Sequence, residues 1–369
     1  MNMVAMVAVW GVTCLGEGTI VIDGDAAAKQ PQVAVDGSGG IHVAYGTPTE
    51  VRYATSVDAG KTFTKPVVVA RVAKMALGMR RGPRIAATRD AVIIAAVVEA
   101  DGPGGAAGSK AEPGRVVAWR STDGGKTWSS GTTLNRVVGS AREGLHALAA
   151  DERGVVKCVW LDLREGEMTV YGATSEDSGA KWSADERVVR SPAKSICTCC
   201  HPSLAIGGDH ALVMWRDDIA GARDMYLGAW EGSGGASPGN ARKLGKGTWI
   251  LEQCPMDGGA IAIDEEGRVT TVWTRAERVY ACDERNVEAL VGPGVQPWAA
   301  GGRRGAHVVW LQKRPGKLMY RAAGELESVA LASAASDPVI ASGPKGRGPV
   351  VAAWESVGEA RGIAVKVVR

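Results

Sequence analysis

Three copies of one short motif constrain the fold of this chain more than any other feature. Each copy reads Ser-x-Asp-x-Gly-x-x-aromatic, and the copies occupy residues 56–63, 121–128 and 175–182. The aspartate can accept hydrogen bonds from nearby backbone N–H groups, glycine supplies a positive φ, and the aromatic ring can fold back onto a sheet. Each copy follows an alternating apolar run, so each is predicted to close a β-hairpin. The residues expected to shape these turns are Ser56, Asp58, Gly60, Phe63, Ser121, Asp123, Gly125, Trp128, Ser175, Asp177, Gly179 and Trp182.

A second pattern occurs seven times along the chain. It reads Pro-x-apolar-Ala or a close variant, then a short polar turn and an alternating strand that mostly ends in Trp, with copies starting at residues 31, 83, 148, 202, 261, 297 and 338. Each copy predicts an inner hairpin with further strands outside it, and a four-stranded antiparallel unit repeated radially is a β-propeller blade. The last unit lacks a fourth strand, and residues 19–23 provide a spare one. We therefore expect an all-β propeller of seven four-stranded blades, with six as the alternative, closed by the N-terminal strand into one domain over residues 17–369.

Composition excludes several classes of protein. The 369 residues include 50 Gly and 12 Trp, and the net charge of +3 is spread along the chain. The sequence contains no basic run of the kind that predicts nucleic-acid binding. The apolar N-terminal stretch is too short to span a bilayer. Residues 1–16 are interpreted as a signal or lipoprotein-type segment, with a mis-started N-terminus as the alternative. We expect a secreted or periplasmic protein, or one lipid-anchored to the cell envelope, that is monomeric by default and needs no cofactor.

Candidate ligand-binding residues come from the loops that enter the first strand and leave the second strand of each unit. These loops share one face of a propeller, around the central channel, and loops carry function disproportionately. The alternative is that any propeller has polar loop ends. The candidates are Arg84, His146, Asp162, Arg164, His201, Arg216, Asp217, Asp257 and Arg275.

Four cysteines are expected to meet at one seam between units. Cys197, Cys199 and Cys200 directly precede one inner strand, and Cys254 precedes the next. Four cysteines permit two disulfides, which would suit an oxidising compartment. A Zn or Cu(I) site made by these thiolates and His201 is the rival interpretation, and free thiols are a third.

The Ser-x-Asp-x-Gly-x-x-aromatic motif resembles the Asp-box of the sialidase (BNR-repeat) superfamily of β-propellers. That resemblance implies a propeller that binds a glycan or glycoconjugate at the channel face. It also implies an alternative, an exo-α-sialidase-type glycoside hydrolase, which requires a Tyr–Glu nucleophile pair, an Asp acid/base and three Arg that grip a carboxylate. The sequence does not assemble that set, so whether the chain is an enzyme stays open and its catalytic residues are unknown. A protein-interaction scaffold is the third reading.

Overall fold

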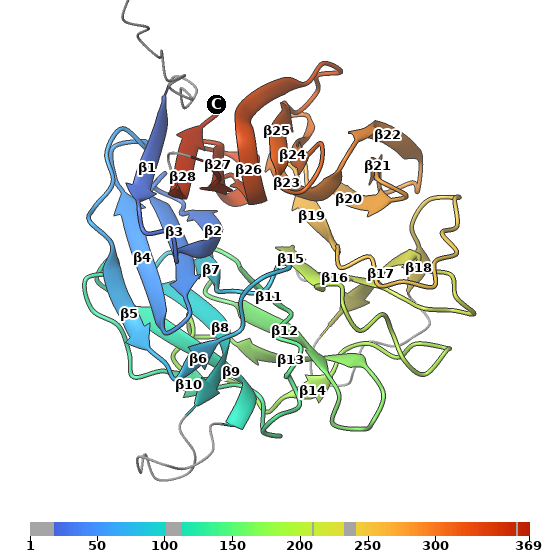
Figure 1. Cartoon of the computed structure of the whole chain (residues 1–369). Helices are drawn as coiled ribbons and strands as arrows, with labels where there is room; N and C mark the ends of the chain where they lie inside the picture. The colour runs from blue at the N-terminus through green and yellow to red at the C-terminus, as the bar shows by residue number, and fades with distance from the viewer. Residues whose placement is uncertain (1–17, 101–111, 209, 232–240, 359–360) are drawn as a thin grey trace, which may run out of the picture.

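The computed structural model describes residues 18–100, 112–208, 210–231, 241–358 and 361–369, and its regular structure is almost entirely β. The described strands form six antiparallel sheets arranged around a common centre (Figure 1). In these segments no helix is long and apolar enough to cross a membrane. The expected leader, residues 1–16, lies outside the described residues.

Four of the sheets contain four strands each, in chain order. They are β2 (Lys29–Val35), β3 (Ile41–Thr47), β4 (Glu50–Ser56) and β5 (Val67–Arg71); β11 (His146–Ala150), β12 (Val156–Asp162), β13 (Thr169–Ser175) and β14 (Glu186–Arg187); β15 (Ser203–Gly207), β16 (His210–Arg216), β17 (Met225–Trp230) and β18 (Arg242–Lys243); and β19 (Gly259–Ile263), β20 (Val269–Arg275), β21 (Arg278–Cys282) and β22 (Glu288–Pro293).

The other two sheets are larger. One contains β6 (Lys74–Met75), β7 (Arg84–Ala87), β8 (Val92–Ala100), β9 (Glu112–Ser121) and β10 (Thr132–Thr133). The other runs through β23 (Val295–Gly302), β24 (Gly305–Leu311), β25 (Gly316–Arg321), β26 (Val329–Ala341), β27 (Val351–Ser356) and β28 (Gly362–Val367) to β1 (Thr19–Asp23). β26 pairs with β25 through its first part and with β27 through its last part, so one long strand joins two repeat units.

Each of the seven predicted inner hairpins is present as an antiparallel pair. The predicted pairing of the N-terminal strand is confirmed as well, because β1 pairs with β28 from Thr19 opposite Lys366 onward. Apolar clusters lie between neighbouring sheets; one of them joins Ile93 of β8 to Trp160 of β12 and Ala173 of β13. Burial against both neighbours explains the near-continuous apolar runs in the second strands.

The three Asp-boxes close the outer hairpins as predicted. In the second box, Asp123 accepts hydrogen bonds from the Oγ of Ser121 (2.8 Å) and from the backbone N–H of Thr127 (2.9 Å). The box glycine faces the preceding sheet: a Cβ on Gly125 would lie 2.1 Å from the ring of Tyr53 in β4. Trp128 also packs edge-on against Tyr53, with ring centroids 5.2 Å apart. The box therefore docks one sheet onto its neighbour.

Strand register separates the two faces of the ring. Val35 at the end of β2 pairs with Ile41, which pairs with Ser56 of the first Asp-box. The inner turns and the Asp-boxes therefore share one face. Lys29 at the start of β2 pairs with Gly46 near the end of β3, so the entering and leaving loops share the opposite face, as predicted.

Candidate functional site

The face opposite the Asp-boxes carries a cluster of buried polar side chains, which come from the loops that enter the inner hairpins and from the strand ends beside them. We call this cluster the channel mouth. It consists of Gln30, Arg80, Arg84, His146, His201, Arg216, Asp257, Gln296, Asp337 and Glu355, all of which are buried.

Arg80 ties together distant parts of the mouth. It comes from the loop between β6 and β7, yet it donates hydrogen bonds to the carbonyl of Pro338 in β26 (2.8 Å) and that of Gln296 in β23 (2.6 Å). Its guanidinium also lies 5.2 Å from the ring centroid of Trp298, a cation–π contact. Met79 and Arg80 both have positive φ, a conformation that non-glycine residues rarely adopt. The loop is thus held in a strained form that aims Arg80 across the mouth.

Five of the nine candidate residues meet in the mouth, and protein groups already use much of their hydrogen-bonding capacity. Arg84 donates to the carbonyl of His146 (3.1 Å), and Arg216 donates to the carbonyl of Asp257 (3.1 Å). His201 contacts the carbonyl of Gly259 through Nε2 (3.0 Å) and stacks on Trp298, with centroids 5.5 Å apart. Burial lowers the pKa of His146 to about 3 and moves that of His201 well below its usual value, so both rings are neutral near pH 7.

Two carboxylates of the mouth balance part of the positive charge of its arginines. Oδ2 of Asp257 accepts hydrogen bonds from Thr274 (2.8 Å) and from the backbone N–H of Gln296 (2.7 Å). Glu355 accepts one from the backbone N–H of Gln30 (2.8 Å). Burial is the largest influence on Asp257 and Glu355, and it raises the pKa of each. Burial therefore disfavours the charged form of both carboxyl groups.

Three residues of the mouth share the same backbone conformation, a bulge with positive φ before a proline. Gln30, Gln296 and Asp337 each directly precede a proline, each has a positive φ, and each lies where its strand shifts register. These bulges turn the side chains toward the mouth, where Gln296 Nε2 donates to Asp337 Oδ1 at 3.0 Å. Such conformations cost about 1–3 kcal/mol each and cluster at functional sites. Sequence reasoning did not select these residues, although the residue before the repeating proline is the signal that marks them.

Some polar atoms of the mouth remain unsatisfied. Among the described residues, no hydrogen-bond partner exists for Gln30 Nε2, Arg80 Nε, His201 Nδ1 or Asp257 Oδ1, and all four atoms are buried. Each such atom costs about 1–3 kcal/mol. The mouth therefore contains buried donors and acceptors that the described protein groups leave unsatisfied.

The other four candidates lie in separate interactions nearer the outside of their sheets. Asp162 accepts hydrogen bonds from Trp160 (2.9 Å) and from Arg164, which also pairs with Asp185. Asp217 accepts hydrogen bonds from Trp215 (3.1 Å) and Ser191 (2.7 Å), and Arg275 forms two hydrogen bonds to Glu288 (2.8 and 2.6 Å). The structure does not bring these four together with the mouth.

One tyrosine–carboxylate pair lies beside Arg164. The hydroxyl of Tyr171 donates to Glu165 (2.5 Å), and the Arg164 guanidinium lies 3.8 Å from the Tyr171 ring centroid. Burial raises the pKa of Tyr171, and the charge of Arg164 opposes that effect. A pocket of about 230 Å³ adjoins the pair and is lined by Glu165, Glu167, Thr169, Arg187, Arg190, Ser191 and Lys194.

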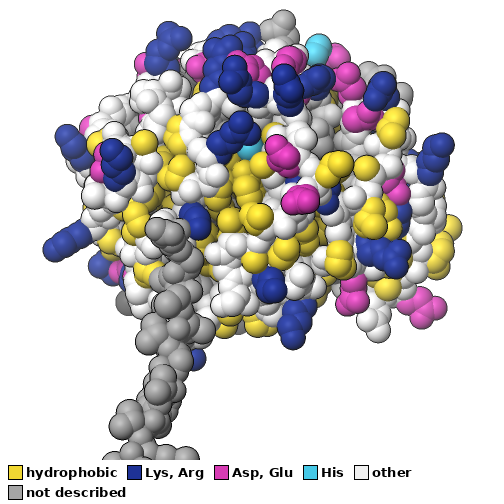
Figure 2. Space-filling view, turned by 90° about the horizontal axis from the view of Figure 1, so that it is seen from above, with side chains coloured by type: hydrophobic (Ala, Val, Ile, Leu, Met, Phe, Trp, Pro, Cys, Tyr) yellow, Lys and Arg dark blue, Asp and Glu magenta, His cyan; other side chains and the backbone are white. Residues whose placement is uncertain are grey.

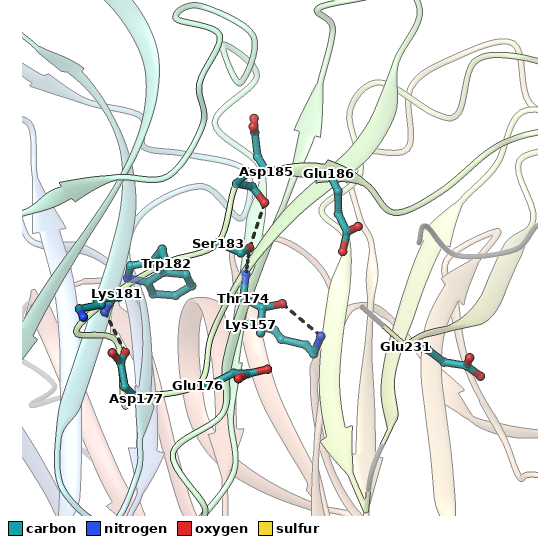
Figure 3. A pocket seen from close by; sticks show the side chains of 11 residues that line it. Lys157, Thr174, Glu176, Asp177, Lys181, Trp182, Ser183, Asp185, Glu186 and Glu231 are labelled. Carbon is teal, nitrogen blue, oxygen red and sulfur yellow. Dashed lines mark hydrogen bonds between the residues drawn. The ribbon is translucent and has the colours of Figure 1, made fainter. Parts of the chain in front are cut away.

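A wider, open pocket of about 640 Å³ lies beside the third Asp-box (Figure 3). In Figure 3, Lys157 lies in the middle of the lining residues, with its Nζ 3.1 Å from the hydroxyl of Thr174, and Trp182 and Asp177 of the box lie to one side. The remaining lining residues are Glu176, Lys181, Ser183, Ala184, Asp185, Glu186 and Glu231. This pocket is separate from the mouth, and sequence reasoning did not single it out.

The cysteine seam forms as predicted, with one disulfide. Cys199 in the loop before β15 is bonded to Cys254 in the loop before β19, with Cα atoms 6.3 Å apart. Cys197 and Cys200 remain thiols, 3.7 Å apart at sulfur, so the second disulfide that the sequence permits is not formed. Cys158 and Cys282 are also free thiols, and both are buried.

Comparison with solved structures identifies the architecture. A Trypanosoma rangeli sialidase in complex with the inhibitor DANA superposes with a TM-score of 0.52 and 12% identity, over 93% of this chain and 55% of that one. An ulvan lyase also superposes, with a TM-score of 0.52 and 11% identity, over 96% of this chain and 93% of that one. It represents a new family of polysaccharide lyases and is bound to a GlcA–Rha3S saccharide. The chain has a sialidase-like β-propeller fold.

These likenesses concern the fold alone, because identity is so low. The propeller spans about half the length of the trypanosomal enzyme. No protein-family model matches the sequence, and no curated protein is significantly similar to it.

Proposed function

We propose that this protein is an exported, seven-bladed propeller that binds an acidic glycan or glycoconjugate at the channel mouth. The blade count is supported by the seven inner hairpins and by the double role of β26. Export is supported by the Cys199–Cys254 disulfide, since such bonds persist in oxidising compartments. Fractionation of cells that express the full chain tests export, and a chain lacking residues 1–16 is the control.

The observation that carries the binding proposal is the excess of positive charge at the mouth. Arg80, Arg84 and Arg216 are buried there. Lys29, which pairs with Glu355 (3.4 Å), and Arg314, which pairs with Asp337 (3.0 Å), extend the cluster toward solvent with 47% and 28% exposure of their side chains. Only three carboxylates oppose them: Asp257, Asp337 and Glu355. A sugar carboxylate can pair with the exposed cations at the edge of this cluster.

An array of sialylated, uronate-containing and neutral glycans tests this proposal, followed by titration at two salt concentrations. We expect acidic glycans to bind and Arg314→Ala to weaken binding about tenfold, or ~1.4 kcal/mol. Arg285→Ala is the matched control, since Arg285 also pairs with an aspartate at 3.0 Å but lies outside the mouth on the turn after β21. Equal loss in both variants, or no acidic glycan bound, contradicts the proposal.

A second candidate function is glycoside hydrolysis by a sialidase-type mechanism. The Tyr171–Glu165 hydrogen bond and the adjacent pocket with Arg187 and Arg190 favour it. The raised pKa of Tyr171 disfavours a standing phenolate, so Glu165 has to take the proton as general base. On a fluorogenic sialoside, Tyr171→Phe then lowers kcat more than about 100-fold, whereas Tyr226→Phe does not. An inactive wild-type protein excludes hydrolysis of that sialoside and leaves the binding proposal intact.

The scaffold interpretation has less support. Large exposed apolar side chains include Val57, Ile250 and Leu326, which lie in loops far apart along the chain. In the space-filling view of Figure 2, hydrophobic side chains cross the middle of the surface among charged and neutral ones. A scaffold needs one contiguous apolar patch.

A further inference from the structure

The sulfur atoms of the cysteine seam lie closer together than one disulfide requires. Cys197 Sγ is 3.6 Å from Cys199 Sγ and 3.7 Å from Cys200 Sγ, and the sulfurs of Cys199 and Cys200 are 4.0 Å apart. The sulfurs of Cys197, Cys199 and Cys254 all lie within 4.8 Å of one another. Two overlapping groups of three sulfurs, which share Cys197 and Cys199, therefore meet at this seam.

These spacings match a tetrahedral metal site. A Zn–S bond of about 2.3 Å gives a tetrahedron whose sulfur–sulfur edge is about 3.8 Å. The three edges among Cys197, Cys199 and Cys200 fall on either side of that value. Cys254 is the one exposed member; its sulfur lies within 4.8 Å of those of Cys197 and Cys199, and it can supply the fourth corner from the opposite loop once its bond to Cys199 is reduced.

The surroundings suit a thiolate site. Only Met256 packs against the three buried cysteines as a partly buried apolar neighbour. The guanidinium groups of Arg216 and Arg223 act electrostatically on Cys197, and the backbone N–H of Cys197 donates to the carbonyl of Arg216 (3.1 Å). Four thiolates and one Zn²⁺ carry a net charge of −2, and Arg216 together with Arg223, which also pairs with Asp218 (3.1 Å), offsets part of it.

We propose that Cys197, Cys199, Cys200 and Cys254 form a four-thiolate Zn²⁺ site when the Cys199–Cys254 disulfide is reduced. A dithiol reductant supplies two electrons and two protons; the disulfide becomes two thiols, and the reductant becomes a disulfide. Binding of Zn²⁺ then releases four protons, one from each thiol. The disulfide and the metal thus compete for Cys199 and Cys254, and either one ties the loop before β15 to the loop before β19.

Metal binding by the full-length protein tests this site. The chain is reduced with a phosphine, freed of metal and titrated with Zn²⁺ against a chromophoric chelator; Co²⁺ then replaces Zn²⁺ to give thiolate-to-cobalt charge-transfer absorption. We expect one equivalent per chain after reduction and no competitive binding before it.

Cys197→Ser and Cys200→Ser retain the disulfide, so their fold is verified first in the oxidised form. After reduction each is expected to lose more than about 100-fold in Zn²⁺ affinity, since changes outside the ligand shell alone cost about 10- to 100-fold. Cys282→Ser is the control and binds as the wild type does. Wild-type affinity in the Cys197 and Cys200 variants overturns the proposal. So does a reduced wild-type protein that takes up no zinc, whether it stays folded or fails to refold when zinc is added.

Discussion

Gly125 and Gly124 provide a matched test of how the Asp-box joins neighbouring sheets. Both have positive φ, +89° and +74°. A Cβ on Gly124 meets nothing within 4 Å, whereas a Cβ on Gly125 lies 2.1 Å from the Tyr53 ring. The two Gly→Ala variants therefore share the conformational cost and differ in the steric one.

The expected loss in the free energy of unfolding is the sum of the conformational cost and the steric cost. A left-handed conformation costs an L-residue about 1–2 kcal/mol, and overpacking costs about 1–3 kcal/mol more. The Tyr53 ring has little freedom to retreat, because its hydroxyl bonds to His42 (2.7 Å) and Trp128 packs against its edge. Gly124→Ala should thus destabilise by about 1–2 kcal/mol and Gly125→Ala by about 2–5 kcal/mol. The effect of alanine on the unfolded chain is the same in both and cancels in the difference.

Equilibrium denaturation in urea, followed by tryptophan fluorescence, measures both variants. If the slope m is unchanged, the shift in midpoint reports the change in the free energy of unfolding. A Tyr53→Leu background should relieve the steric term and bring the two glycine variants together. A Gly125→Ala variant that is as stable as Gly124→Ala would refute the inter-sheet role of this glycine.

Three further predictions concern stability. The pKa of buried His146 is lowered to about 3, below its value in the unfolded chain. The stability that neutral His146 contributes is therefore complete above about pH 6.5, and about 2 kcal/mol of it is lost at pH 5. His146→Asn should flatten the pH dependence of the denaturation midpoint, whereas the control His210→Asn, at an exposed site, should not. Asp123→Ala removes the acceptor of the Asp-box turn and should lower the melting temperature, whereas a variant that melts with the wild type would mean that the turn holds without its carboxylate. Replacing both Cys199 and Cys254 by Ser in metal-free buffer should cost about 4 kcal/mol for a separation of 55 residues, and a loss below about 1 kcal/mol would show that contacts alone hold the two loops.

Much of the fold was predictable because its signals are local. The alternation of apolar residues and the Asp-box turns depend on neighbours within a few positions, so the hairpins and the strand phase follow from the sequence. That phase correctly placed the cysteine loops side by side and put the Asp-boxes on the face away from the mouth. The spare strand at residues 19–23 also had a predictable partner, since the last unit was one strand short.

The candidate site was only half predictable, because its contacts join residues distant in sequence. Arg80 reaches β23 and β26 across more than 200 positions, and no local pattern encodes that distance. The bulges at Gln296 and Asp337 turn side chains that a regular strand would aim elsewhere. The sequence by itself thus determined the repeating hairpins, their faces and the meeting of the cysteines. Only the arrangement of the sheets around a common centre decided which side chains meet at the mouth, because loops from separate units converge there in space but not along the chain.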